Sequence, residues 1–428
     1  MTTWTAFAFL GRQGFYGTLD SEKRKAPLEH FTVERRKGNK MNPFFDTAPD
    51  HRKNGSYRWE QPAGRDDVIG MGTADLDYCC PECVKEACLA IAQENAYNYR
   101  KKPDSYFQIV TDWYRRKYGL LAEKEWLSNV PSTIGAIRIA LSALTRPGDA
   151  VIMQSPFFGP LPRAVESAGC RLVENPMIRQ DGVYALDFAD FEQKLRDEKP
   201  SIFLLVNPHN PTGRVFSPKE LERLVALCEQ YDVKIISDEV HGLIIYPGKK
   251  HIPVLAVSPA ARRLSVQVMS MSKGFNLMSL PHAIVAVADP VLRAAWNDEV
   301  IPYSFGYATN PFSMAAAAKV MDGSADQWLS DLTDYLKENR DLAVSFLQNE
   351  VPGMRATVPE GSFLLWIDCS ELGLENPAEF LLEKAGVSVN DGAEFGNAYG
   401  QFIRMNFALT RQNLQTALDR IKKAVAAR

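Results

Sequence analysis

Unbroken runs of apolar residues recur through the middle of the chain, with amphipathic segments between them. Runs that lack alternating polar residues are typical of strands whose two faces are both covered. The predicted strands are Ala150–Gln154, Ile202–Val206, Lys234–Ser237 and Leu264–Met269. Because helical and strand signals alternate from about Pro81 to Asp289, this part of the chain is predicted to be an α/β domain with a mainly parallel sheet.

One connecting helix is marked especially well. Ser217-Pro218-Lys219-Glu220 is a capping box with proline at the first helical position. Apolar residues then follow at helical spacing, namely Leu221, Leu224, Val225 and Cys228. This pattern predicts a crossover helix between two parallel strands.

After about Asp322 the pattern changes. A helix carrying Leu332, Tyr335 and Leu336 precedes strand-like segments at Gly361–Asp368 and Phe402–Phe407, and Thr410 is a predicted cap of a closing amphipathic helix. This α+β pattern predicts a smaller C-terminal domain. The expected organisation is an extension over 1–40, an N-terminal arm over 41–75, a large domain over 76–321 and a small domain over 322–428.

The first forty residues differ from the rest. An apolar beginning is followed by the basic stretch Glu34-Arg35-Arg36-Lys37, the reverse of the charge order in a secretory signal. The codons possible for the segment before Met41 include purine-rich strings that resemble a bacterial ribosome-binding site. Two interpretations stay open: a start codon assigned too early, or a real disordered extension.

Composition narrows the class of protein. The chain has 428 residues, 46% of them hydrophobic, and a formal net charge of −3. These values indicate a globular protein without the basic field that non-specific nucleic-acid binding needs. Seven cysteines do not suit a disulfide framework, and no apolar run approaches the ~20 residues of a membrane span. We therefore expect a cytoplasmic enzyme with neither a nucleic-acid nor a membrane partner.

Three polar groups follow consecutive predicted strands. Asn210 lies in the segment after the strand Ile202–Val206, Asp238 ends the next strand, and Lys273 follows the strand Leu264–Met269. The carboxyl ends of parallel strands meet at one edge of a sheet, so these side chains are expected to share a site. Pyridoxal 5'-phosphate (PLP) requires such a set: an amine for its aldehyde, a carboxylate for its ring nitrogen and a donor for its ring hydroxyl.

These motifs resemble the fold-type I, aspartate-aminotransferase-like class I/II superfamily of PLP-dependent enzymes. They are most similar to its cystathionine β-lyase/cysteine-S-conjugate β-lyase branch. The resemblance runs from about Met41 to the C-terminus and rests on an ordered set of motifs. This set comprises Ala74-Asp75-Leu76-Asp77, Tyr99-Arg100, Asn207–Gly213, Ser237–His241, Ser272–Asn276 and Arg404-Met405-Asn406. The implied fold is a PLP-binding large domain with a smaller α+β domain.

The resemblance implies roles around the cofactor ring. Lys273 is expected to be the Schiff-base lysine and the base that removes the Cα proton of the substrate. Asp238 would pair with the pyridine nitrogen, and Asn210 would donate to the ring hydroxyl. His241 lies where the superfamily often offers a tyrosine hydroxyl to the same oxygen. Phe158 would stack on the ring, although the family usually has a tyrosine there.

Phosphate and substrate contacts follow in the same way. The phosphate would be held by the helix start Ser132-Thr133-Ile134, where free N–H groups and the helix dipole favour an anion, and by Ser270. Tyr99 would reach it from the other subunit of a homodimer. Arg404 would bind the substrate α-carboxylate, and Asp75 is expected among the substrate-binding residues.

The substrate pocket departs from the family pattern more than the cofactor shell does. Met71-Gly72-Thr73 and Ala408-Leu409-Thr410 replace the usual residues beside two motifs, and Ile301–Pro311, expected to line the pocket, has its own sequence. Cys79, Cys80, Cys83 and Cys88 have no second ligand pair downstream, so we predict ordinary packing and no metal site.

The leading hypothesis is a carbon–sulfur β-lyase that acts on cystathionine or cysteine S-conjugates and releases a thiol, pyruvate and ammonia. The missing hydroxyl at Phe158 counts against lyase chemistry. An aminotransferase using the same residues is the alternative. A cofactor-binding regulator is a third hypothesis, but residues 1–40 are too short and unpatterned for a DNA-binding domain.

Overall fold

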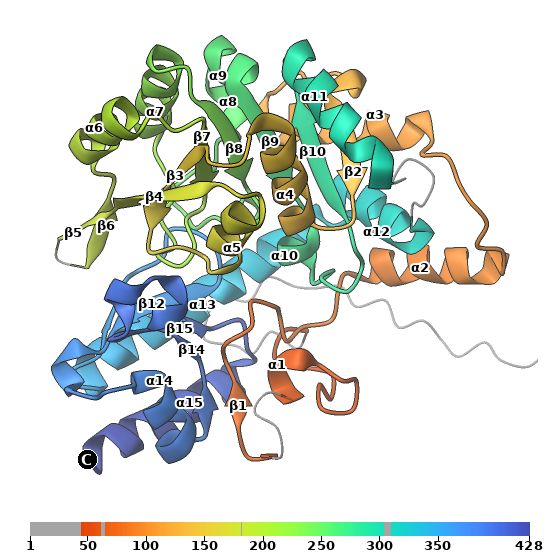
Figure 1. Ribbon diagram of the computed structural model, residues 1–428. Helices are drawn as coiled ribbons and strands as arrows, with labels where there is room; N and C mark the ends of the chain where they lie inside the picture. Colours follow the sequence, from red (N-terminus) through yellow and green to blue (C-terminus); the bar gives the residue numbers. More distant parts are fainter. Residues whose placement is uncertain (1–43, 61–64, 181, 304–309) are drawn as a thin grey trace, which may run out of the picture. The chain divides into compact units, whose positions relative to one another are not determined.

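The computed structural model describes residues 44–60, 65–180, 182–303 and 310–428 (Figure 1). The interpretations of residues 1–40, and much of the segment Ile301–Pro311, fall outside these ranges. Residues Asn42–Arg428 form a compact unit of their own. None of the described helices is both long and apolar enough to cross a bilayer.

A seven-stranded sheet is the centre of the fold. Across the sheet its strands are β2 (Leu127–Val130), β10 (Ala283–Val287), β9 (Ser265–Met269), β8 (Lys234–Asp238), β7 (Ile202–Val206), β3 (Ala150–Ser155) and β4 (Arg171–Pro176). β10 pairs antiparallel with both β2 and β9, and the other neighbouring strands pair in parallel. The four strands predicted from apolar runs are confirmed, with ends that differ by at most one residue.

Both faces of this sheet are covered, which explains why its strands are apolar throughout. Alternate residues of one strand belong to two different core clusters: Phe203 packs on one side and Leu204 on the other. The helices of the large-sheet region are α2 (Glu82–Glu94), α3 (Asp104–Tyr118), α4 (Thr133–Leu144), α5 (Pro160–Ser167), α6 (Phe188–Glu198), α7 (Pro218–Gln230), α8 (Val254–Val257), α9 (Pro259–Leu264), α10 (Ser272–Phe275), α11 (Pro290–Val300) and α12 (Pro311–Met321).

A smaller antiparallel sheet follows. Its strand order is β11 (Arg355–Ala356), β12 (Leu364–Asp368), β15 (Phe402–Asn406) and β14 (Asn390–Asp391). Helices α13 (Asp326–Glu350), α14 (Pro377–Phe380) and α15 (Arg411–Ala426) accompany it. The α+β character expected after Asp322 is therefore present.

The N-terminal segment contributes to this second region. After α1 (Tyr57–Glu60), β1 (Ile69–Gly70) pairs in parallel with β13 (Val387–Ser388), so the expected arm is tied to the C-terminal part. A hairpin of β5 (Ile178–Gln180) and β6 (Val183–Ala185) completes the strands. In Figure 1, α10 lies between the large sheet and the blue C-terminal part.

Local capping signals are confirmed. Ser217 and Glu220 form the reciprocal capping box of α7, and the hydroxyl of Thr410 accepts from the N–H of Asn413 at the start of α15. Cys83 and Cys88 lie on α2, partly buried against the core. All seven cysteines are free.

Candidate active site

The carboxyl ends of three neighbouring strands carry the central residues. β7, β8 and β9 lie side by side, with Val206 opposite Asp238 and Asp238 opposite Val268. Asn210 follows β7, Asp238 ends β8, and Lys273 lies on α10 just after β9. The structure thus brings together the amide, the acid and the amine that the sequence placed on consecutive strands.

The amine of Lys273 lies in a largely enclosed place. Its Nζ donates to the carbonyl of Ala74 at 2.5 Å. Burial, and after it the nearby Arg404 cation, lower the pKa of Lys273 to about 8, although Asp75 and Asp238 act in the opposite direction. A lysine with this pKa is partly unprotonated near neutral pH, as a nucleophile or a base must be.

Asp238 is a buried carboxylate that lacks a counter-charge. Its Oδ1 accepts from the N–H of Val240 at 3.2 Å, and none of the described cations lies within ion-pair distance. Burial, with a smaller contribution from Glu239, raises the pKa of Asp238 to about 6, while the N–H of Val240 and the charge of Lys273 oppose the rise. A buried carboxylate without a cation is costly unless a ligand supplies one, and a protonated pyridine nitrogen is such a group.

Arg404 on β15 is the complementary case, a buried cation without a carboxylate. It is only 3% exposed, and no described Asp or Glu lies within ion-pair distance. Its Nη2 donates to Oδ1 of Asn390 at 2.6 Å and to the carbonyl of Gly72 at 3.1 Å, whereas its Nε has no hydrogen-bond partner within the described chain. Burial lowers the pKa of Arg404 to about 10. The unmet charge and donor fit an anionic ligand.

Arg404 also determines the orientation of Asn210. Its Nη1 donates to Oδ1 of Asn210 at 3.2 Å, and because an arginine can only donate, Asn210 must present its amide oxygen to Arg404. The NH₂ group of Asn210 is therefore left to donate elsewhere, as the predicted contact with a ring hydroxyl requires.

The predicted phosphate cup has the geometry of a helix start. Ser132 is the N-cap of α4, and its Oγ accepts from the N–H of Gly135 at 3.0 Å. The N–H groups of Thr133 and Ile134 belong to the first turn, which has no intrahelical acceptors for them. Ser270 is buried, and its hydroxyl donates to the carbonyl of His282 at 2.7 Å. These groups therefore fit an anion, with Ser270 engaged by the backbone.

The other predicted residues lie in different settings. His241 is buried, and its Nδ1 lies 2.9 Å from the hydroxyl of Ser362; burial holds the pKa of His241 well below its usual range. Phe158 follows β3 and is partly buried against the core. Tyr99 is 85% exposed and lies in the connection between α2 and α3, away from α10 (Figure 1). The structure does not bring Tyr99 to the site of its own chain.

Sequence reasoning missed several residues that shape this site. Asn390 accepts from Arg404, and Ser362 contacts His241. The side-chain NH₂ of Asn406 donates to the carbonyls of Thr73 and Asp75, which holds the strip that carries Asp75. Asn406 belongs to the motif Arg404-Met405-Asn406 and could have been identified from it, whereas no local sequence pattern marks Asn390 or Ser362.

Arg58 is a further residue that the sequence did not mark as part of the site. Its guanidinium is buried, lies 2.8 Å from Oδ1 of Asp75 through Nε, and contacts Oδ1 of Asp77 through Nη2. Burial raises the pKa of Asp75, and Arg58 opposes this rise. Asp77 is fully buried and also accepts from the indole N–H of Trp59 at 3.0 Å. Arg58 therefore holds both acids of the Ala74–Asp77 motif.

We expect Arg58→Met to destabilise the protein by about 3–5 kcal/mol, because it leaves two desolvated carboxylates without their cation. Urea unfolding followed by circular dichroism measures this loss. Arg65→Met is the matched control: Arg65 pairs with Asp67 on the surface, where solvent screens the ion pair and its loss should change stability little. Equal midpoints for the two variants would contradict the structural role of Arg58.

A lysine, a buried unpaired acid and a buried unpaired arginine at the carboxyl edge of a parallel sheet define the class of PLP-dependent fold-type I enzymes. The family described as aminotransferase class I and II matches residues 66–421, and the chain belongs to this family. PLP is its cofactor, and its substrates are amino acids.

Comparison with known proteins gives relatives of both lyase and transferase type. The chain is 30% identical over 387 residues to cystathionine beta-lyase PatB of Bacillus subtilis, covering 89% of this chain and 100% of the relative. It is similar to the structure of the PLP-bound C-S lyase from Staphylococcus hominis in complex with L-cycloserine, with a TM-score of 0.84 and 28% identity. The match covers 92% of this chain and 99% of the lyase chain. An aspartate aminotransferase of Pyrococcus horikoshii is 27% identical over 376 residues, which cover 86% of this chain and 93% of the relative.

Proposed function

We propose that this protein is a PLP-dependent carbon–sulfur β-lyase that acts on cystathionine or cysteine S-conjugates. The observation that carries the proposal is the 30% identity with cystathionine beta-lyase PatB over that relative's whole length. The overall reaction takes one S-substituted cysteine and one water to a thiol, pyruvate and ammonium. The bond that breaks joins Cβ to sulfur, and the proton that must leave first is on Cα.

The chain's residues divide this chemistry among them. PLP, when bound, supplies an electron sink for the Cα carbanion. Asp238 would hold the proton on the ring nitrogen, and Asn210 and His241 would contact the ring hydroxyl. Phe158 would pack on the ring, while Ser132, Thr133, Ile134 and Ser270 would hold the phosphate.

Lys273 has two duties in this proposal. Its amine would hold the cofactor through the aldehyde, and the same amine would accept the proton from Cα of the substrate. The lowered pKa of Lys273 supports both duties. Arg404 binds the α-carboxylate, for which its buried, unpaired guanidinium is suited. Asp75 lies close enough to Lys273 for its carboxylate to raise the pKa of the lysine, against the effect of burial.

Transamination is the second candidate, favoured by the similarity to the aspartate aminotransferase. The two reactions are separated by incubating the holoenzyme with cystathionine or S-methylcysteine, with and without 2-oxoglutarate. A lyase releases pyruvate without the added oxo acid. Pyruvate that forms only in its presence, or glutamate formed at the rate of substrate loss, would contradict the lyase proposal.

We further propose that the active unit is a homodimer in which Tyr99 completes the phosphate site of the partner. The support is the 85% exposure of Tyr99, which a tyrosine with a polar function at a subunit boundary would lose on assembly. The same segment carries Tyr97, also exposed, so this part of the surface is rich in aromatic residues.

Mixed dimers test this arrangement. Tyr99→Ala is expected to weaken cofactor binding and leave little activity, and Lys273→Ala is expected to be inactive. When equal amounts of the two variants exchange subunits, about one quarter of the wild-type activity should return, because one site in each mixed dimer receives both intact residues. Tyr97→Ala serves as the control and should keep its own activity. Subunit exchange without recovered activity would contradict the shared site.

A further inference from the structure

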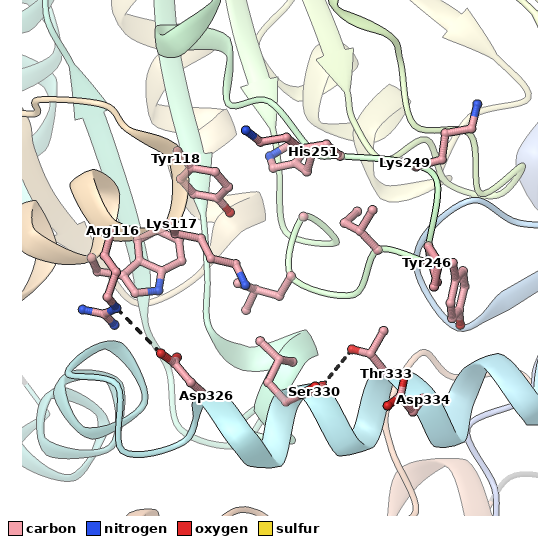
Figure 2. A pocket seen from close by; sticks show the side chains of 17 residues that line it. Arg116, Lys117, Tyr118, Tyr246, Lys249, His251, Asp326, Ser330, Thr333 and Asp334 are labelled. Atoms are coloured by element: carbon pink, nitrogen blue, oxygen red, sulfur yellow. Dashed lines mark hydrogen bonds and ion pairs between the residues drawn. The ribbon is translucent and has the colours of Figure 1, made fainter.

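A cavity of about 540 Å³ lies beside the active site but does not include Lys273, Asp238 or Arg404. It is bounded by the end of α3, by the loop from Gly242 to His251 and by the first half of α13 (Figure 2). Its volume falls within the range of about 300–1,000 Å³ that small-molecule sites occupy. Nothing in the proposed lyase chemistry uses this cavity.

The cavity is cationic in a chain whose net charge is −3. Four cations and two carboxylates line it, namely Arg116, Lys117, Lys249, Lys250, Asp326 and Asp334. Arg116 lies 3.7 Å from Asp326, and Lys249 lies 2.7 Å from Glu360. Lys117 and Lys250 form no ion pair with any described residue. In Figure 2 the side chain of Lys117 extends into the hollow, where an anion would meet it.

Apart from the polar side chains of His251, Ser330 and Thr333, the uncharged part of the lining is mainly apolar or aromatic, which restricts the kind of anion. Trp113, Leu243 and Tyr246 are buried side chains that border the cavity. Inorganic ions gain nothing from such walls, whereas a hydrocarbon body is stabilised when it is buried against them. We propose that this cavity is a binding site for a small organic carboxylate with an apolar body, and that its occupancy is sensed at the active site.

Two connections lead from the cavity to the active site. His251, on the cavity wall, holds Oε2 of Glu239 at 3.1 Å through Nε2, and Glu239 is next to Asp238. Nδ1 of His251 has no hydrogen-bond partner within the described chain. On the other side, Leu243 packs so closely on Gly274 that a Cβ there would lie 2.6 Å from its Cδ1. Gly274 follows Lys273, so a ligand that moves this loop acts on both catalytic elements.

Calorimetry of the holoenzyme with 3-phenylpropionate tests the binding site. We expect saturable binding that weakens at least tenfold in the double variant Lys117→Ala/Lys250→Ala and is unchanged in Lys219→Ala, an exposed lysine on α7 outside the cavity. The uncharged 3-phenylpropanol should bind at least tenfold more weakly. Absence of binding, or inorganic phosphate binding more tightly than 3-phenylpropionate, would overturn the assignment.

A carboxylate could instead occupy the substrate site at Arg404, and a second variant separates the two. Arg404→Gln, with its fold checked by circular dichroism, should retain 3-phenylpropionate binding. If it loses binding while the double lysine variant keeps it, the cavity is not the site. The visible absorbance of bound PLP should change with the same midpoint as the calorimetric titration. A spectrum unchanged at saturation would overturn the connection to the active site.

Discussion

Lys273→Ala is expected to lower the turnover of cysteine S-conjugates at least about a thousandfold, which corresponds to about 4 kcal/mol of barrier. The variant lacks both the amine that attaches the cofactor and the base for the Cα proton. The described chain places no other lysine among the site residues that could take its place. Purified wild-type protein should carry the visible absorbance of attached PLP, and the variant should not.

Borohydride reduction followed by peptide mapping locates the attachment point. In the wild-type protein the reduced adduct should map to the peptide that contains Lys273. Lys219→Ala is a suitable control, because Lys219 is an exposed residue in the first turn of α7. A reducible adduct at another lysine would show that the assignment of Lys273 is wrong.

Asp238→Asn is expected to retain PLP but to lose more than tenfold in turnover, more than about 1.4 kcal/mol of barrier. The amide occupies nearly the same volume but cannot stabilise a proton on the ring nitrogen, so the carbanion loses its electron sink. Asp238 is buried, accepts a hydrogen bond from one backbone donor and has no described cation within ion-pair distance. Its negative charge is therefore available to stabilise a positive group of the ligand.

The control for this variant is Asp298→Asn, an exposed acid on α11. Both variants should show bound cofactor by absorbance after gel filtration, and only Asp238→Asn should turn over slowly. A loss of less than tenfold with cofactor bound would count against the proposed role. Reconstitution with an analogue that has carbon in place of the ring nitrogen should leave the wild type as impaired as the variant.

Functional residues could be predicted from the sequence where they directly follow a strong local pattern, such as an apolar run or a helix cap. Asn210, Asp238 and Lys273 each follow an apolar run, and parallel strands deliver their carboxyl ends to one edge. Ser132 was identifiable as a helix start because capping depends on residues three positions apart. The residues around the substrate were harder to predict from the sequence, because they come from short strands of the second sheet.

Unbroken apolar runs, a capping box and strand-end residues were enough, by themselves, to predict the α/β class, the α+β end and the convergence of Asn210, Asp238 and Lys273, whereas the roles expected around PLP rested on the family resemblance. Only the tertiary structure decided which groups complete the site. Arg404 contacts Asn210, 194 positions away, and Gly72, 332 positions away, and Lys273 contacts Ala74 across 199 positions. The buried pair of Arg58 with Asp75 and Asp77, and the connection of His251 to Glu239, likewise depend on folding. The physical reason is that periodicity and helix capping depend on neighbours within a few residues of one another. Charge compensation in a buried site depends instead on which distant side chains the packed elements bring together.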